Sequence, residues 1–551
     1  MNRRRFLAGL GAGMVAGSQV LQSALAQVPS AGAIPERDYE SLGIDTDPIG
    51  GHPISPEKQV LFTDYRHIET GDLGWFDPNG NVLPTAGPPG EPLAARARTG
   101  MTPWGVRLQV VKPKIEGPLP NGPPGRALLD DGTFKCWTMK GKYAPGKDLG
   151  SYSVEQPTSI AIIAHESKDG YDWQEKGSSE IPVGDVTAFD GCHFFIDPHA
   201  RSEERYKGVF SAGFVSGSAA AAELWKHYAR LHPIYRHPLL NAKLVGALYG
   251  LTSPDGINWK RIEKPLLMHL GDTDNTVYYD QWLGMYVLYT RQYWFRRRMI
   301  ARAVSEDFRT WSPAEPIIWP DLGDPLSHDI YLNCRTSYPG LPSYHLMFPM
   351  VYRRFDQSSE IQMYSSIDGR LWNRLPGGPI LEVGGFDGQP IEFMNVTGNL
   401  LPVKNDRIAI WYTGNSVPHK YPRWEGNSKN YRGWAWWQPG RLGAVVADEV
   451  GEFYTFKMPI LGKQLRVNAQ VARAGEIRVG LANKAGSGAM EDVIIEEKDR
   501  SVDVCDPISG DSTAHVVTWQ GQADLGRPLD SSYSLHFKLR KAKLFGFEWV
   551  S

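Results

Sequence analysis

The chain has few cysteines, and their spacing does not suggest a metal site or a redox pair. Its 551 residues include only four cysteines, and the sequence contains no Cys-x-x-Cys pair. This scarcity argues against zinc-ribbon and thioredoxin-like motifs. We therefore expect no bound metal and no cofactor, and spacing does not pair the cysteines into disulfides. They are Cys136, Cys192, Cys334 and Cys505.

A strong net charge is also absent, as are the signatures of several enzyme classes. The formal net charge is −2 at pH 7, so nothing global points to nucleic acid or to an anionic membrane. No G-x-S-x-G, H-E-x-x-H or P-loop motif occurs, which argues against serine-hydrolase, zincin and nucleotide mechanisms. Beyond the N-terminus there is no run of about 18 apolar residues, so we expect no membrane-spanning helix.

The N-terminus carries a targeting pattern. Arg3-Arg4-Arg5-Phe6-Leu7 precedes a Gly/Ala-rich apolar run, and Ala24-Leu25-Ala26 follows as a cleavage signal. Together these features predict a twin-arginine signal peptide over residues 1–26, with export of the folded protein to the periplasm or beyond. The alternatives are an ordinary secretory signal or a retained N-terminal anchor.

The most informative feature is a phrase, Ser-x-Asp-Gly-x-x-Trp, that returns along the chain. Complete copies begin at Ser167, Ser253 and Ser366, and a fourth begins at Ser305 with Phe308 in place of the glycine. Each copy ends a stretch of alternating apolar residues. Asp-Gly favours a tight turn because glycine tolerates positive φ, and the Ser and Asp side chains can bond nearby backbone N–H groups. A phrase recurring between strands predicts a repeated β unit, typically a propeller blade.

The spacing of strands and turns divides the chain into four parts. The content of 58 Gly and 41 Pro favours strands and turns over long helices. We expect residues 27–125 to be a lead-in and wrapping segment and residues 126–459 to form a five-bladed β-propeller. Residues 460–551 lack the phrase but alternate in runs such as 465–468 and 476–479, which predicts a C-terminal β-sandwich. The expected fold class is all-β.

Propeller geometry then predicts where a site lies. The start of each blade's inner strand and the loop joining its second and third strands share one mouth. Asp274, Asp329 and Glu392 fall at inner-strand starts, and converging carboxylates suit glycosidic bond cleavage by acid/base or nucleophilic catalysis. Such residues also commonly just bond the loop backbone. We take these three as candidate catalytic residues.

Residues near these acids are the candidate substrate contacts. Residues 415–440 are expected to form a second-to-third-strand loop whose aromatic side chains suit stacking on sugar rings; these are Trp424, Tyr431, Trp434, Trp436 and Trp437. Arginines in the corresponding loops would bind an anionic group, or pair with neighbouring acids. The set comprises Asp190, His193, Asn275, Tyr331, Asn395, Arg297 and Trp434.

The closing phrases, the blades, the acids at inner-strand starts and the trailing strands together resemble the five-bladed propeller glycoside hydrolases. These are families 32, 43, 62 and 68, and particularly the group similar to the family 32 N-terminal domain. The resemblance implies that Glu392 is the catalytic acid and that Asp274 and Asp329 are its two partners. The chain departs from the pattern in two respects. The invertase-type opening is shortened to Trp75-Phe76-Asp77-Pro78-Asn79-Gly80, which makes Asp77 a weaker candidate, and no Arg-Asp-Pro or Glu-Cys motif occurs at the expected strand starts.

The function expected from these observations is an exported glycoside hydrolase with a poly- or oligosaccharide substrate. Two alternatives stay open: a glycoside phosphorylase on the same fold, whose arginines would hold phosphate, and a non-catalytic carbohydrate-binding propeller. A sialidase is disfavoured because its Ser-x-Asp-x-Gly phrase does not occur. The sequence leaves the sugar, the linkage and the oligomeric state open.

Overall fold

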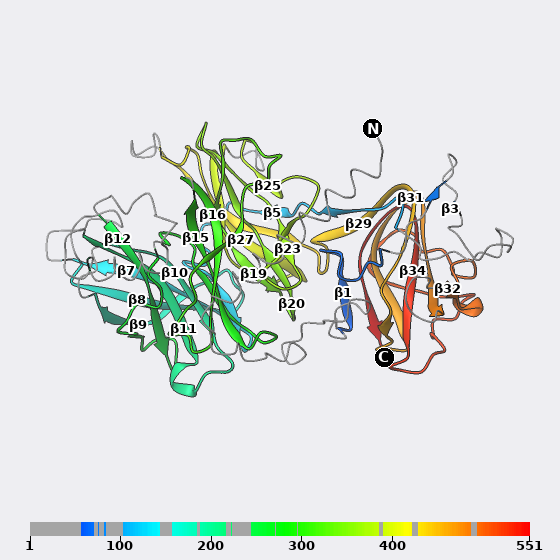
Figure 1. The fold of residues 1–551 in the computed structure, drawn as a ribbon, viewed down its shortest axis with the longest axis horizontal. Helices are drawn as coiled ribbons and strands as arrows, with labels where there is room; N and C mark the ends of the chain where they lie inside the picture. Colours follow the sequence, from blue (N-terminus) through cyan, green and yellow to red (C-terminus); the bar gives the residue numbers. More distant parts are fainter. Residues whose placement is uncertain are drawn as a thin grey trace, which may run out of the picture. The chain divides into compact units, whose positions relative to one another are not determined.

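The computed structural model describes residues 57–70, 75–76, 82–83, 103–143, 157–183, 188–215, 222, 244–269, 271–294, 296–384, 390–420, 428–485 and 493–551. In this part of the chain the fold is all-β, and the other named elements are short 3₁₀ turns at Ser202–Glu204 and Lys498–Arg500 (Figure 1). The predicted signal peptide and Asp77 fall outside it. Within the same ranges, no helix has the length and apolar character needed to cross a membrane.

Most strands belong to consecutive antiparallel units of four strands. Unit 1 is β6–β9, unit 2 is β10–β13, and unit 3 is β14–β17. Their bounds are β6 Leu128–Asp130, β7 Thr133–Lys142, β8 Ser159–Ser167, β9 Gln174–Pro182, β10 Ala188–Ile196, β11 Tyr206–Val215, β12 Leu244–Ser253, β13 Lys260–Arg261, β14 Thr276–Asp280, β15 Met285–Trp294, β16 Arg297–Ser305 and β17 Glu315–Ile318.

Unit 4 has the same chain path, but its strands are interrupted, so it forms two small four-stranded sheets, β18-β21-β22-β25 and β19-β20-β23-β24. Unit 5 consists of β26, β27 and β28 and is completed by β5 from the N-terminal side. The bounds are β5 Lys114–Glu116, β18 His328–Leu332, β19 Arg335–Tyr338, β20 Leu341–Met347, β21 Met350–Arg353, β22 Ser359–Ile361, β23 Tyr364–Ser366, β24 Asn373–Arg374, β25 Leu381–Glu382, β26 Phe393–Val403, β27 Arg407–Asn415 and β28 Asn430–Trp437.

Contacts between units follow the chain and then return to its beginning. Elements of consecutive units touch, as in β7 with β10, β10 with β14, β16 with β18 and β19 with β26. In addition, β26 of unit 5 contacts β6 of unit 1. The pairing of β5 with β28 places a strand that precedes unit 1 on the outer edge of unit 5, which covers a sheet edge that would otherwise be exposed.

The recurring phrase forms the turn that its residue types predict. In the copy at Ser253, the Oγ of this serine accepts the N–H of Gly256 at 3.0 Å, and Oδ1 of Asp255 accepts the N–H groups of Ile257 and Asn258 at 2.8 and 2.7 Å. The Trp259 indole N–H donates to the Gly256 carbonyl at 2.9 Å. The hydrogen bonds to the carboxylate lower the pKa of Asp255 to about 2 despite an opposing burial effect. In the fourth copy, Phe308 takes the glycine position with φ of 64°.

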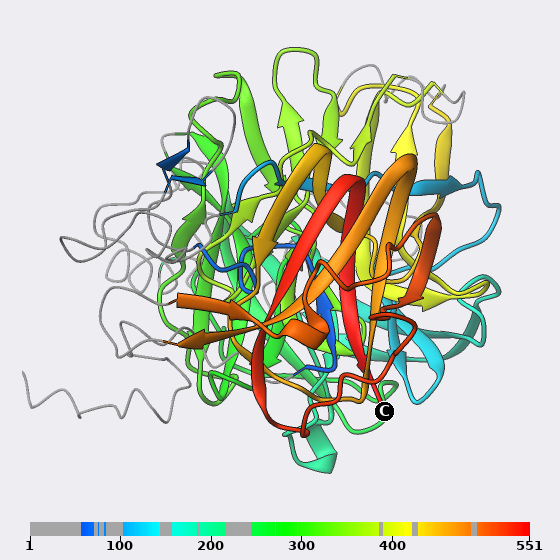
Figure 2. The same cartoon turned by 90° about the vertical axis from the view of Figure 1, so that its right-hand side faces the viewer.

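The remaining strands form an eight-stranded sheet with the order β32-β31-β34-β29-β4 and side pairings of β1, β30 and β33 (Figure 2). The bounds are β1 Gln59–Leu61, β4 Arg107–Val110, β29 Gly443–Tyr454, β30 Met458–Pro459, β31 Gln464–Ala485, β32 Val493–Glu496, β33 Asp511–Val516 and β34 Ser532–Val550; β2 Trp75–Phe76 and β3 Val82–Leu83 pair separately. The two predicted runs at 465–468 and 476–479 are parts of one long strand, β31, whose register shifts between Val471 and Glu476. The hydrophobic core of the eight-stranded sheet includes Phe453, Phe537 and Phe547.

A buried charge cluster joins three strands of this sheet. The His536 imidazole on β34 lies between two carboxylates, contacting Glu496 through Nδ1 and Glu452 through Nε2 at 3.3 Å. The Tyr454 ring stacks on it with a centroid distance of 4.1 Å, and the Trp104 indole N–H donates to Glu452. Burial opposes protonation, but the two carboxylates outweigh it and raise the pKa of His536. Hydrogen bonds to His536 hold the pKa values of Glu452 and Glu496 low against burial.

This cluster predicts a stability maximum at mildly acidic to neutral pH. Because the pKa of His536 is raised, its contribution is complete below its unfolded pKa of about 6.5 and is lost as pH rises through the folded value. The lowered carboxylate pKa values have the opposite sign, so their contribution is lost on strong acidification. We expect the melting temperature of the wild type to fall with rising pH above about 6.5 more steeply than that of His536→Gln.

The variant leaves two buried carboxylates without their cation, so it should destabilise the protein by about 3–5 kcal/mol at neutral pH. Combining it with Glu496→Gln should restore part of that loss. Parallel pH profiles of melting temperature for wild type and His536→Gln would contradict the assignment.

Candidate active site

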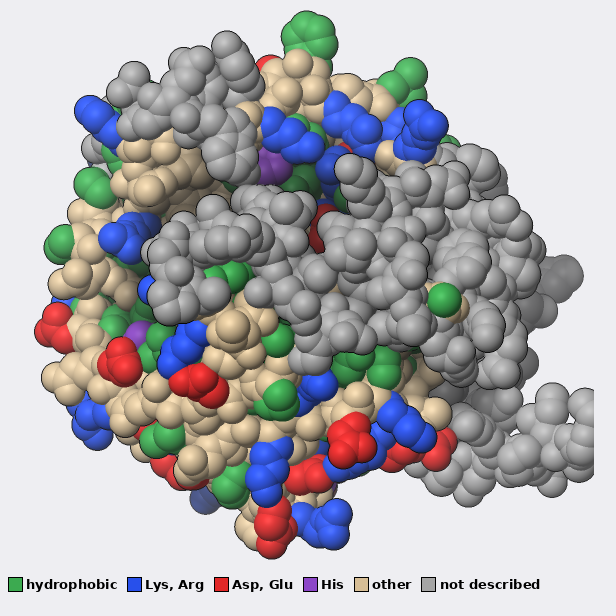
Figure 3. Space-filling model, turned by 90° about the vertical axis from the view of Figure 1, so that its left-hand side faces the viewer, with side chains coloured by type: hydrophobic (Ala, Val, Ile, Leu, Met, Phe, Trp, Pro, Cys, Tyr) green, Lys and Arg blue, Asp and Glu red, His purple; other side chains and the backbone are tan. Residues whose placement is uncertain are grey.

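Polar side chains from units 2 to 5 form a connected cluster at the starts of inner strands. We call Asp190, Asp272, Arg291, Tyr331, His419 and Glu392 the mouth residues. Asp190 lies in β10, Asp272 precedes β14 and Arg291 lies in β15, whereas Tyr331 lies in β18, Glu392 precedes β26 and His419 follows β27. Figure 3 shows one face of the molecule, where acidic, basic and histidine side chains gather around a hollow.

An ion pair at the start of unit 3 anchors one side of the cluster. Nη1 of Arg291 donates to Oδ1 of Asp272 at 2.7 Å, and the Arg291 side chain is 2% exposed while that of Asp272 is 41% exposed. Burial opposes the charge on Arg291, but Asp272 outweighs that effect and raises its pKa. The ion pair fixes the position of the Asp272 side chain, part of which reaches solvent.

Asp190 is the second carboxylate beside this pair. It reaches solvent, but surrounding protein desolvates it and raises its pKa, and the negative charge of Asp272 acts in the same direction. A hydrogen bond from the Gly191 N–H and the charge of Arg291 oppose the shift without cancelling it. A carboxyl group with a raised pKa beside a second carboxylate is an arrangement that acid/base catalysis can use.

Arg291 also links this pair to the next two units. Its Nε and Nη2 donate to the Tyr331 carbonyl at 3.2 and 3.0 Å, and its guanidinium lies 4.0 Å from the centroid of the Tyr331 ring. The Tyr331 hydroxyl is 3.0 Å from Nε2 of His419, and the His419 ring stacks on Phe393 at 4.6 Å. Phe393 follows Glu392, which is exposed and whose backbone N–H donates to the Asn415 carbonyl.

Asp274 lies in a separate set of contacts. Its Oδ1 accepts from Nη1 of Arg126 at 2.9 Å, and its Oδ2 accepts from the N–H groups of Asn333 and Cys334 at 3.0 and 2.6 Å. Asp274 adopts φ of 37°, a left-handed conformation that these contacts hold. This carboxylate ties units 3 and 4 to the segment before unit 1, with both of its oxygens already accepting hydrogen bonds.

Asp329 is buried against arginines rather than open to solvent. It is 0% exposed, and its Oδ2 accepts from Nη1 of Arg298 and from Nε of Arg354, both at 2.8 Å. The Arg298 guanidinium in turn lies 4.8 Å from the Tyr331 ring centroid. A substrate could therefore contact these arginines but not Asp329 itself. Through Arg298, Asp329 supports the position of Tyr331.

The other candidate substrate contacts are engaged in the scaffold. His193 is buried, its Nδ1 accepts from the Val277 N–H at 3.2 Å, and burial together with Arg126 holds its pKa well below the usual value. Asn275 is buried and donates to the carbonyls of Gly191 and Gly271. Oδ1 of Asn395 accepts from Thr413, and Arg297 donates to the carbonyls of His328 and Leu326.

The expected aromatic loop at residues 415–440 needs correction. Residues 430–437 form β28, which pairs with both β27 and β5, so their side chains alternate between faces instead of gathering at a rim. Trp434 is 1% exposed and packs on Trp411 at 5.0 Å, so its ring is not accessible to a sugar. Tyr431 and Trp437 are also buried, and Trp424 lies outside the described residues.

Three of the mouth residues, Asp272, Arg291 and His419, are not among the candidates that the sequence suggests. Asp272 lies two residues before Asp274, so strand alternation is a signal that both acids could share one face. Arg291 and His419 have no comparable signal, because their roles depend on contacts between units. In the part of the chain that is described, no group of three or more His, Cys, Asp or Glu residues is arranged to hold a metal ion.

Comparison with known proteins gives only distant likenesses. No family model matches the chain, and no curated protein sequence matches it. Among solved structures, a family 32 β-fructofuranosidase of Bombyx mori is similar with 9% identity and a TM-score of 0.38, covering 81% of this chain and 93% of that one.

A thermostable family 43 glycoside hydrolase is similar with 14% identity and a TM-score of 0.35, covering 57% of this chain and 91% of that one. An N-acetylgalactosamine deacetylase from F. plautii also has a TM-score of 0.35, with 12% identity, covering 61% of this chain and 96% of that one. Likenesses at these TM-scores carry no argument about activity, which has to come from the site itself.

The proximity of Asp190 and Asp272 makes a prediction that does not depend on any activity. In Asp272→Asn, the like charge beside Asp190 is removed and Arg291 loses its carboxylate partner. Both changes favour the ionised form of Asp190, so its pKa should fall. Carbodiimide labelling, which consumes protonated carboxyl groups, should therefore stop at lower pH for Asp190 in the variant than in the wild type, as read by peptide mass spectrometry.

Asp131 provides the internal reference for reagent reactivity, since its side chain is 96% exposed. An unchanged pH profile at Asp190, with Asp131 behaving alike in both proteins, would show that Asp190 and Asp272 are not coupled.

Proposed function

We propose that the five four-stranded units, which run from β6 to β28 and include β5, are the blades of a β-propeller, and that the eight-stranded sheet is a β-sandwich. The boundary expected between residues 459 and 460 is moved toward the N-terminus, because β29 and β30 pair with β34. The ordered contacts between units, the contact of β26 with β6 and the closure of unit 5 by β5 support this arrangement. In this arrangement inner strands line a central axis. We also propose that residues 1–26 direct export through the twin-arginine route.

We propose that the protein is a glycoside hydrolase whose active site is the set of mouth residues. The observation that carries this proposal is the pair Asp190 and Asp272, in which the Asp190 carboxyl has a raised pKa and the Asp272 carboxylate is fixed by an ion pair with Arg291. Hydrolysis of a glycosidic bond needs one carboxylic acid and one carboxylate on either side of the bond. The substrate class is a poly- or oligosaccharide.

In the proposed reaction, Asp190 is the general acid. Its proton passes to the glycosidic oxygen as the bond from that oxygen to the anomeric carbon breaks, so the leaving group departs as an alcohol. Asp272, as a carboxylate, stabilises the positive charge that develops on the ring and takes a proton from the attacking water, or attacks the anomeric carbon itself. The first route returns Asp190 as a carboxylate and Asp272 as an acid, which exchange protons with solvent. In the second route, water then hydrolyses the glycosyl ester on Asp272 while Asp190, now a carboxylate, takes a proton from that water, so both groups return to their starting states.

Tyr331, His419 and Glu392 are proposed to position the sugar opposite this pair. Burial raises the pKa of Tyr331, so its hydroxyl stays neutral and hydrogen-bonds in both directions. Glu392 is exposed at the start of β26, where its carboxylate is available to accept from sugar hydroxyls. Asp274 and Asp329, which the sequence suggests as catalytic partners, are proposed instead as positioning residues, because their oxygens already serve Arg126, Arg298 and backbone N–H groups.

The arginine contacts favour hydrolysis over phosphorolysis. A phosphorylase needs cations that are available to inorganic phosphate. In this cluster Arg291 is paired with Asp272, Arg298 and Arg354 are paired with Asp329, and Arg297 donates to two carbonyls. A non-catalytic sugar-binding protein would need no carboxyl group with a raised pKa beside a second carboxylate, and this favours the enzyme as the explanation of the site.

The roles of Asp190 and Asp272 can be tested by comparing substrates whose leaving groups do and do not need protonation. Once a cleaved glycan is found by screening purified protein against a panel, with and without phosphate, Asp190→Asn should lower kcat on it by at least about 100-fold. Its activity on an aryl glycoside with an activated phenol leaving group should be nearly retained, since such a group departs without protonation. Asp272→Asn should lose activity on both substrates.

The matched control is Asp131→Asn, an exposed aspartate in a hairpin turn, which should leave kcat unchanged. If Glu392→Gln rather than Asp190→Asn shows the leaving-group dependence, Glu392 is the acid, as the family resemblance implies, and the role proposed for Asp190 is wrong. If no glycan is cleaved but one binds equally well to wild type and both aspartate variants, the protein is a carbohydrate-binding module.

A further inference from the structure

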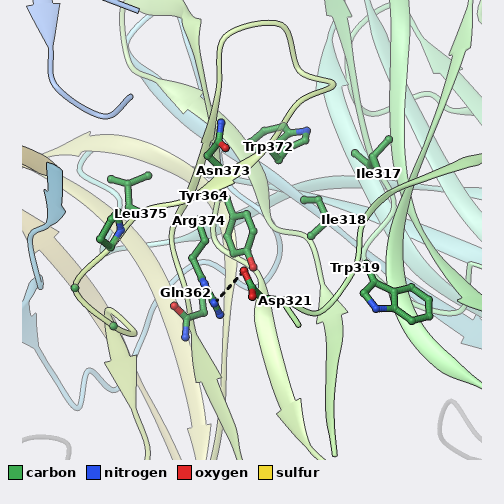
Figure 4. Close-up of a pocket in the computed structure, with 13 residues that line it drawn as sticks. Ile317, Ile318, Trp319, Asp321, Gln362, Tyr364, Trp372, Asn373, Arg374 and Leu375 are labelled. Carbon is green, nitrogen blue, oxygen red and sulfur yellow. Dashed lines mark ion pairs between the residues drawn. The ribbon is translucent and has the colours of Figure 1, made fainter. Parts of the chain in front are cut away.

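A groove lies between units 3 and 4, away from the mouth residues (Figure 4). Its walls come from β17 and the loop after it, and from β23, β24 and the segment that follows β24. The volume is about 640 Å³, which is within the range of about 300–1,000 Å³ typical of small-ligand sites. Because β17 and β24 are the last strands of their sheet paths, the groove opens at the outer edges of the two units rather than at inner-strand starts.

Aromatic rings mark two edges of this groove. Trp319 follows β17 and is 38% exposed. Trp372 belongs to the recurring phrase, and its orientation is held because its indole N–H donates to the Gly369 carbonyl at 3.1 Å and its ring meets that of Tyr289 edge-on at 5.7 Å. Figure 4 shows the two indoles apart from each other, with Ile317 and Ile318 drawn between them and the polar side chains to one side in this view. Because the Trp372 ring is already held in place, stacking a ligand on it costs little side-chain entropy.

The floor of the groove beside the rings is polar, and its side chains hold one another in place. Nη1 of Arg374 donates to Oδ1 of Asp324 at 2.6 Å, and its Nη2 lies 3.4 Å from Oδ2 of Asp321. The Tyr364 hydroxyl points toward Asp321 in Figure 4. Burial raises the pKa of Tyr364 to about 12, so this hydroxyl is neutral at physiological pH and both donates and accepts. Asn373 is exposed beside it and adds an amide.

The charges of the groove select among ligands. The single guanidinium of Arg374 is matched by two carboxylates, Asp321 and Asp324, so an anionic ligand would meet net repulsion. A purely apolar ligand would desolvate the Asp321 carboxylate and the Asn373 amide without replacing their hydrogen bonds. A neutral sugar meets both conditions, because its C–H faces stack on aromatic rings and its hydroxyls bond to carboxylates, amides and phenols.

We propose that this groove is a second carbohydrate-binding site, distinct from the mouth, which takes a short segment of a neutral oligosaccharide between Trp319 and Trp372. The choice of ligand class rests in part on the proposed function, whereas the existence of the site rests on the groove. A polysaccharide held at the edge of units 3 and 4 raises the local concentration of glycan at the mouth. The groove residues touch no reacting bond, so they contribute to binding of long substrates and not to the chemical step.

Affinity electrophoresis in native gels tests the proposal on the intact protein. The gels contain inulin, arabinan, arabinoxylan or β-glucan as neutral probes, and pectate as an anionic probe. We expect at least one neutral glycan to retard the wild type, and Trp319→Ala to weaken that binding by about tenfold or more. Tyr364→Phe, which removes one hydroxyl and keeps the ring, should weaken it by a smaller factor.

The matched control is Trp282→Ala, because Trp282 is 51% exposed but lies in the hairpin turn after β14. This control should be retarded as the wild type is. Retardation of Trp319→Ala equal to that of the wild type, or retardation of the wild type by pectate alone, would overturn the proposal.

A second readout separates the groove from the mouth. If the mouth is active, Trp319→Ala should raise KM for the polymer and leave kcat on a small aryl glycoside unchanged. Binding that survives in Trp319→Ala but is lost in Tyr331→Ala refutes the groove and leaves the proposed function intact. Binding that depends on Trp319 in a protein that cleaves no glycan refutes the proposed hydrolase and leaves the groove intact.

Discussion

The buried guanidinium of Arg291 is the interaction on which the mouth depends. It donates to the Asp272 carboxylate and to the Tyr331 carbonyl, and it lies against the Tyr331 ring. A buried cation needs such partners, because removing one of a buried pair typically costs about 3–5 kcal/mol. The raised pKa of Asp190 reflects desolvation by surrounding protein and the nearby Asp272 charge, which together outweigh the opposing charge of Arg291. The positions of Asp272 and Tyr331 at the mouth therefore depend on one side chain.

The scaffold that presents this side chain is built from a local rule. Each copy of the recurring phrase ends the third strand of its unit with the same kind of turn, in which backbone N–H groups donate to a serine hydroxyl and an aspartate carboxylate. Because the turn satisfies its own backbone groups, it needs little from neighbouring units. The loops between second and third strands can then differ in length and content without altering the sheets, and in unit 5 such a loop carries His419.

Ligand-facing surfaces at the inner and outer edges of the units have different characters. At the mouth, carboxyl groups lie close to an arginine, and the charge of each group affects the others. The groove between units 3 and 4 has exposed indole and amide groups beside one guanidinium that is paired with two carboxylates. The first arrangement suits bond cleavage, where charge develops in the transition state. The second suits reversible binding of a neutral surface, for which shape and stacking suffice.

Some features of this protein follow from short-range rules, which depend on residues a few positions apart in the sequence. Other features depend on long-range contacts. The phrase Ser-x-Asp-Gly-x-x-Trp predicts its own turn, alternating apolar residues predict the all-β strands, and carboxylates at strand starts, such as Asp190 and Glu392, can be found in the same way. Trp434 shows where such rules fail: its segment resembles a rim loop, but pairing with β5, more than 300 residues earlier in the chain, makes it a strand and buries the ring. The same division applies to the acids, since Asp272 has 41% side-chain exposure and Asp329 has 0%. A carboxyl group's proton affinity depends on desolvation and on charges within a few ångströms, and the arginines that supply those charges come from strands whose proximity no local pattern encodes.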